Sequence, residues 1–167
     1  LGCVLAPLAE ELLFRKALLD RLKPYGEGFA ILASALLFAL VHGNLFQMLY
    51  AFAVGGFFGY VALRTGGGRW TIPLHAGVNF VSAGLSPLLE HFGDRGESAL
   101  SYFILFSLVF GWYLLSARYR DRDRDEGLAP GSAGMEAGEK WGLFLVNPGM
   151  TVFCLLILFA VLLAMRM

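Results

Sequence analysis

The chain consists of long apolar runs joined by shorter polar connections. None of the runs alternates apolar and polar positions with the period of two that is typical of a half-buried strand. A membrane interior tolerates only helices and closed barrels. A helix needs about 20 apolar residues to cross it, and the run at 29–42 is short enough to be tilted, re-entrant or buried among neighbours. We therefore predict an all-α, polytopic transmembrane helix bundle with about six apolar segments, at 1–14, 29–42, 45–63, 70–90, 100–117 and 150–167.

Composition agrees with this pattern. Hydrophobic residues make up 57% of the chain and charged residues 16%, whereas a soluble domain has about 25% charged residues. The formal net charge is zero, so we expect no nucleic-acid partner. Cys3 and Cys154 lie in apolar runs without a ligand-like neighbour and are predicted to pack as small core residues. The apolar start at Leu1 carries no basic leader and predicts no signal peptide, and we expect further helices upstream in a longer protein.

Basic residues gather in every second connection. We predict that the loops at 15–28, 64–69 and 118–149 are cytoplasmic, because cytoplasmic loops of membrane proteins carry the excess of Lys and Arg. The opposite connections hold Arg95 and Arg166. The other 11 of the 13 basic residues are Arg15, Lys16, Arg21, Lys23, Arg64, Arg69, Arg118, Arg120, Arg122, Arg124 and Lys140.

The same patterning divides the chain into three parts. Residues 1–117 are predicted to form the helical core, and 150–167 an additional C-terminal transmembrane helix. Between them, 118–149 begins with alternating Arg and Asp and continues with Gly, Pro, Ala and Ser, which predicts a charged, flexible linker. Within the core, Gly55 and Gly59 form a small-xxx-small pair that favours close helix packing.

Ionisable side chains interrupt the first apolar run at Glu10, Glu11 and Arg15. Such groups are costly inside a membrane and usually face a bundle interior or a cavity. Glu11 and Arg15 are four residues apart and can pair on one helix face, whereas Glu10 is rotated away by roughly 100°. One carboxylate is therefore predicted to be structural and the other to be available for chemistry. The alternative is a helix end at the interface with both glutamates solvated.

Two further polar pairs lie in the following runs. Phe38 precedes His42 by one helical turn and is placed to pack on its ring. His75 and Asn79 are also one turn apart, and both point the same way from an otherwise apolar helix. The alternatives without a catalytic role are an interfacial histidine at position 42 and a polar contact between helices at 75 and 79.

Together these residues suffice for amide hydrolysis. A carboxylate and an imidazole can take a proton from water, and a His/Asn pair can donate hydrogen bonds to an oxyanion. Two histidines and a glutamate are also a known catalytic zinc set. We expect no cofactor, but the residues alone leave open a zinc site made by Glu10, His42 and His75.

In order and spacing, these motifs resemble those of the CPBP family, the CAAX proteases and bacteriocin-processing enzymes, also called the Abi or type II CAAX prenyl endopeptidase family. The family motifs EExxxR, FxxxH and HxxxN have counterparts at Glu10, Glu11 and Arg15, at Phe38 and His42, and at His75 and Asn79. The resemblance covers about residues 4–90.

The resemblance implies an intramembrane glutamate protease without an obligatory metal. It implies that Glu10 and His42 activate the attacking water and that His75 and Asn79 stabilise the oxyanion. Glu11, Arg15 and Phe38 would then support the site. The expected partners are membrane lipid and membrane-associated, prenylated or precursor peptides, in a bacterial or archaeal plasma membrane. A non-catalytic binding, immunity or regulatory protein of the same family and a proton or metal transporter remain the alternatives, and the oligomeric state is left open.

Overall fold

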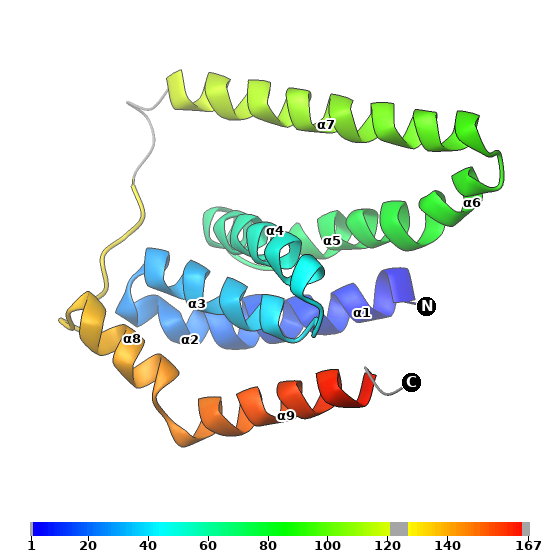
Figure 1. The fold of residues 1–167 in the computed structure, drawn as a ribbon. Coiled ribbons are helices and arrows are strands. Elements are labelled where there is room, and N and C mark those ends of the chain that lie inside the picture. The colour runs from blue at the N-terminus through cyan, green and yellow to red at the C-terminus, as the bar shows by residue number, and fades with distance from the viewer. Residues whose placement is uncertain (1, 121–126, 165–167) are drawn as a thin grey trace. The chain divides into compact units, whose positions relative to one another are not determined.

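The computed structural model describes residues 2–120 and 127–164, which fall into two compact units. One unit comprises Leu1–Leu8 with Pro73–Gly127, and the other comprises Ala9–Ile72 with Leu128–Met167. Every named element within the described ranges is a helix (Figure 1). The prediction of an all-α fold is therefore confirmed.

The first long helix changes its winding along its length. It runs as an α-helix in α1 (Gly2–Glu11), as a π-helix in η1 (Leu12–Leu18) and again as an α-helix in α2 (Leu19–Leu22). A single 3₁₀ turn, η2 (Lys23–Tyr25), follows it. Gly26, with φ of 111°, then redirects the chain into α3 (Glu27–Leu40), a conformation that favours glycine because it lacks a Cβ.

Helices α3 and α4 (Leu45–Thr65) pack against each other closely. A Cβ added at Gly55 would lie 3.0 Å from Cδ1 of Phe38 and 3.3 Å from the Cα of Ala35, and one added at Gly59 would lie 3.5 Å from Ile31. The small residues thus let the two backbones approach, as the small-xxx-small pair predicted. Two apolar clusters of this unit lie along the contact, one around Phe14, Phe38, Ala39 and Ala51, the other around Leu19, Ala30, Ile31 and Ala62.

The other unit is built on a second helix with a π-helical interruption. It runs through α5 (Thr71–Asn79), η3 (Phe80–Leu85) and α6 (Ser86–Glu90), and a tight turn leads to α7 (Asp94–Arg120). Pro87 lacks a backbone N–H, so the ordinary helical hydrogen bond cannot form at that position. The wider winding just before it, with the Ser86 N–H bonded to the Val81 carbonyl, accommodates the proline.

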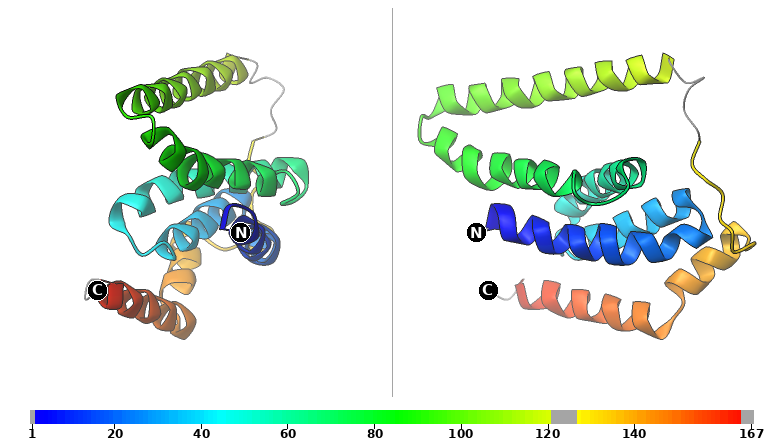
Figure 2. Two further views of the ribbon diagram at one scale, coloured as in Figure 1. Left: turned by 90° about the vertical axis from the view of Figure 1, so that its right-hand side faces the viewer. Right: turned by 180° about the vertical axis from the view of Figure 1, so that it is seen from behind.

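The predicted linker contains a helix that the sequence pattern did not indicate. Residues 137–145 form α8 (Ala137–Leu145), which begins with a capping box between Glu136 and Glu139. A bend of 55° separates it from α9 (Pro148–Ala164), and Figure 2 shows the change of direction between the two helices. Asn147 holds the bend, because its Nδ2 donates to the carbonyls of Leu143 and Phe144 while its Oδ1 accepts from the Met150 N–H. The prediction for 121–126 lies outside the described residues.

The helices match the predicted apolar segments in position, but fewer of them qualify as membrane spans. By length and composition alone, two helices in the described ranges could cross a bilayer, Gln47–Thr65 and Thr71–Glu90. The bent pair Ala137–Leu145 and Pro148–Leu163 would be a third if it counts as one span. Helix α3, at 14 residues, is short, as the pattern predicted. The expected number of about six spans is therefore supported only in part.

Candidate functional site

A buried ion pair lies where α1 passes into η1. Nε of Arg15 is 3.2 Å from Oε2 of Glu11, and both side chains are 0% exposed. Two opposite charges can remain ionised at such a place only when they are paired. The predicted pairing of Glu11 with Arg15 is therefore present, and Glu11 has a structural partner that accounts for its charge.

Aromatic rings surround the guanidinium of Arg15. Its Cζ lies 4.8 Å from the ring centroid of Phe38, 5.9 Å from that of Phe58 and 6.0 Å from that of Phe14. In the described part of the chain, Nη1 and Nη2 of Arg15 have no hydrogen-bond acceptor. The charge is thus stabilised by the neighbouring Glu11 carboxylate and by ring faces, which attract cations within about 6 Å.

The π-helical winding of η1 is fixed by a neighbouring helix. The Leu19 N–H bonds to the Phe14 carbonyl five residues back, and the hydroxyl of Ser34 in α3 donates to the same carbonyl at 3.0 Å. Ser34 is fully buried. Short π-helical segments frequently occur at functional sites, and this one begins directly after Glu10 and Glu11.

His42 lies just beyond the end of α3, in a turn before Gly43. Its Nδ1 is 2.7 Å from the Phe38 carbonyl oxygen, and its ring packs edge-on against the Phe38 ring at 4.9 Å. A carbonyl can only accept, so Nδ1 carries the proton and Nε2 keeps its lone pair in the neutral imidazole. The contact between Phe38 and His42 confirms the predicted packing. It also leaves Nε2 as the ring nitrogen that can accept a proton or a hydrogen bond.

Glu10 differs from its neighbour in exposure. Its side chain is half-buried, whereas Glu11 is 1% exposed. The difference follows from the helical rotation between adjacent residues, which turns Glu10 away from the face that carries Glu11 and Arg15. Of the two carboxylates, Glu10 is therefore the more exposed.

His75 and Asn79 belong to the other unit and lie one turn apart on α5. His75 is 4% exposed, and Asn79 is half-buried. The Asn79 carbonyl accepts from the Cys3 thiol at 3.6 Å, and the π-helical η3 begins at the next residue. A π-helical segment thus begins directly after Asn79, as η1 begins directly after Glu11.

Contacts within one unit therefore join Glu11, Arg15, Phe38 and His42 into a continuous chain of interactions. Ser34, Phe14 and Phe58 also belong to this arrangement, although the sequence pattern did not indicate them. Ser34 and Phe38 in α3 and His42 just beyond it are spaced four residues apart, and this spacing was the available signal for Ser34. Among the described residues, no group of three or more His, Cys, Asp or Glu side chains is placed to hold a metal ion.

Residues 1–81 match the model of a protein family described as type II CAAX prenyl endopeptidase Rce1-like. The matched range contains all three polar motifs. No curated protein and no solved structure matches the chain.

Proposed function

The chain belongs, through residues 1–81, to the Rce1-like family of type II CAAX prenyl endopeptidases, and we propose that it is a membrane-embedded endopeptidase of the glutamate type. Its apolar helices suit a protein of a family that is embedded in the membrane. The proposed substrates are membrane-associated peptides, prenylated or precursor-like.

The difference between the two adjacent glutamates is the observation that carries this proposal. Glu11 is buried and paired with Arg15 at 3.2 Å, so its carboxylate has a structural role in balancing the buried guanidinium. Glu10 is half-buried and more exposed than Glu11, and it takes the role of the general base in the proposal. A positioned general base typically contributes about 10²- to 10⁴-fold to a hydrolytic rate.

In the proposed reaction, the Glu10 carboxylate takes a proton from water. Nε2 of His42 accepts the hydrogen bond of the second O–H, because Nδ1–H is already donated to the Phe38 carbonyl. The oxygen of the water attacks the carbonyl carbon of the scissile peptide bond, and the carbonyl oxygen becomes an oxyanion.

His75 and Asn79 are the proposed donors to that oxyanion. The i,i+4 spacing on α5 supports the assignment, because it directs both side chains toward one place. As the C–N bond breaks, Glu10 returns the proton to the leaving amine. The products are a new carboxylate and a new N-terminal amine, and no metal takes part in these steps.

We test the proposal by peptide cleavage in proteoliposomes, comparing the wild type with Glu10→Gln. The substitution removes the base but preserves shape, so the rate should fall at least about 100-fold while the thermal unfolding midpoint stays unchanged. Each reaction is repeated with excess chelator, and the substrate set contains both prenylated and unmodified peptides.

The outcomes separate the alternatives. Cleavage that is lost in Glu10→Gln and kept in chelator supports the glutamate mechanism. Loss in chelator as well would indicate a metalloprotease that uses Glu10, His42 and His75. Full activity in Glu10→Gln would contradict the assignment of the base, and a folded wild type that cleaves none of the peptides would favour the binding or regulatory alternative.

A further inference from the structure

A part of the chain beyond the family match docks on the matched part. The Glu27 N–H donates to the Ala129 carbonyl at 3.0 Å, the Ala129 N–H donates to Oε2 of Glu27 at 2.9 Å, and the Ala133 N–H donates to the Pro24 carbonyl at 3.0 Å. The approach is close, because a Cβ at Gly131 would lie 2.4 Å from the Tyr25 backbone. The segment at 128–133 is therefore fixed against the end of the first helix.

Helix α8 continues this docking with aromatic contacts. The Phe29 ring lies 4.9 Å from the Trp141 ring and 5.8 Å from the Phe144 ring, both edge-on. These ring contacts hold α8 beside the start of α3.

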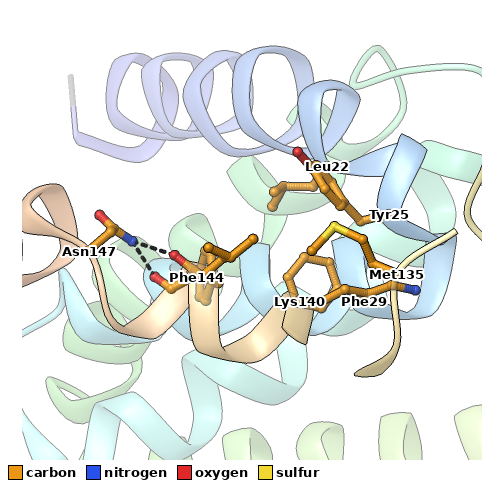
Figure 3. A pocket seen from close by; sticks show the side chains of 8 residues that line it. Leu22, Tyr25, Phe29, Met135, Lys140, Phe144 and Asn147 are labelled. Carbon is orange, nitrogen blue, oxygen red and sulfur yellow. Dashed lines mark hydrogen bonds between the residues drawn. The ribbon is translucent and has the colours of Figure 1, made fainter. Parts of the chain in front are cut away.

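A cavity of about 220 Å³ remains between the docked segment and the first helix (Figure 3). Apolar side chains predominate in its lining, and Lys140 supplies the positive charge. The lining residues are Leu22, Tyr25, Phe29, Met135, Lys140, Leu143, Phe144 and Asn147.

The side chains that line the cavity favour the binding of an amphiphile, a molecule with an apolar chain and a charged group. Pockets for whole drug-sized ligands measure about 300–1,000 Å³, so a cavity of 220 Å³ suits part of one hydrocarbon chain. Lys140 is half-buried and takes part in none of the salt bridges of the described residues. A half-buried ammonium beside apolar walls favours an anionic group attached to an apolar chain.

The position of the cavity beside apolar helices favours a membrane lipid as the molecule that carries the hydrocarbon chain. The cavity lies between α2 and α8, and α8 leads through the 55° bend into the apolar α9. Leu143 and Val146 at the end of α8 are 64% and 82% exposed, as expected for an amphipathic helix lying in a bilayer interface. We propose that this cavity binds an anionic phospholipid, with one acyl chain between α2 and α8 and the phosphate paired with Lys140.

The proposal is tested with the full chain in detergent, carrying Trp70→Phe and Trp112→Phe so that Trp141 is the reporter. Phosphatidylglycerol with brominated acyl chains should quench Trp141 in a saturable manner. Brominated phosphatidylcholine should bind several-fold more weakly, and Lys140→Gln should weaken phosphatidylglycerol binding about fivefold, since one basic residue contributes about that much to anionic-lipid binding. Leu143→Phe, which narrows the cavity, should reduce quenching by both lipids.

Two matched variants serve as controls. Lys16→Gln removes a charge from the exposed face of the first helix, and Leu145→Phe enlarges a residue of α8 outside the cavity; both should bind like the wild type. Equal quenching by the two lipids with no effect of Lys140→Gln would overturn the proposal, as would displacement of the lipid by a peptide with a free C-terminal carboxylate or by inorganic phosphate alone. Peptide cleavage is not measured, so the result does not depend on the proposed activity.

Discussion

The pair formed by Glu11 and Arg15 shows how one buried charge can have a structural role. The guanidinium has a carboxylate on one side and three aromatic rings around it. Removing one partner of a buried pair leaves the other as an uncompensated charge, which costs about 3–5 kcal/mol. Glu11→Gln should therefore lower the free energy of unfolding by an amount of this order, measured by denaturant unfolding in detergent micelles.

Glu10→Gln is the matched control for this prediction, because it makes the same chemical change one residue away on a half-buried side chain. It should lower the free energy of unfolding by clearly less than Glu11→Gln does, because its side chain is less buried. Equal losses of stability in the two variants would mean that the ion pair with Arg15 does not make Glu11 more important for stability than Glu10. The assignment of a structural role to Glu11 and a catalytic role to Glu10 would then be contradicted.

Ser34 makes a second residue-level contribution. Its buried hydroxyl donates to the Phe14 carbonyl inside the π-helical turn. Ser34→Ala should reduce the free energy of unfolding by about 1 kcal/mol, the usual net value of such a bond. Ser107→Ala, which removes an exposed hydroxyl bonded to the Phe103 carbonyl, should have little effect in the same denaturant titration. A neutral Ser34→Ala would show that η1 keeps its winding without this bond.

At the scale of elements, the close contact between α3 and α4 depends on which of the adjacent glycines of α4 faces α3. A Cβ at Gly55 would press on Phe38 and Ala35, whereas one at Gly56 would have no heavy atom within 4 Å. Gly55→Ala should therefore destabilise the protein by about 1–3 kcal/mol through overpacking. Gly56→Ala should be neutral or stabilising by up to about 1 kcal/mol, because alanine favours helix.

The same comparison tests the link to the site, since Phe38 also contacts Arg15 and His42. Thermal unfolding followed by tryptophan fluorescence gives the order of stabilities, and peptide cleavage gives the functional effect. Gly55→Ala should reduce both and Gly56→Ala neither. The reverse order of stability would show that α4 presents its other face to α3.

The apolar runs were sufficient to predict where the long helices lie. The same reading missed α8, because its nine residues include glycines, charges and only a short apolar end. It also missed the π-helical turns, since a carbonyl shared by Leu19 and Ser34 depends on tertiary contact and has no local sequence signature. The i,i+4 spacing did predict the contacts of Glu11 with Arg15 and of Phe38 with His42, because those depend on helical geometry alone.

At the scale of the whole molecule, one contact bears on membrane topology. The distribution of basic residues predicts that the loops at 15–28 and 118–149 share the cytoplasmic side. Backbone hydrogen bonds join Pro24 to Ala133 and Glu27 to Ala129, and two loops can bond in this way only if they lie on the same side of a bilayer. The contact supports the proposed arrangement independently of the charge count.

Cysteine labelling tests this topology in the whole chain, after Cys3 and Cys154 have been changed to alanine. Ser132→Cys lies in the docked segment and should react with a membrane-impermeant maleimide only in inside-out vesicles. His91→Cys, in the turn between α6 and α7, should react only in right-side-out vesicles, because an odd number of crossings separates it from the loop at 15–28 in the six-segment arrangement. Labelling of both from the same side would mean that α7, which lies between the two positions, does not cross the bilayer. Because the two basic loops remain bonded, an even number of crossings would then separate the loop at 15–28 from His91, instead of the three that the six-segment arrangement places there.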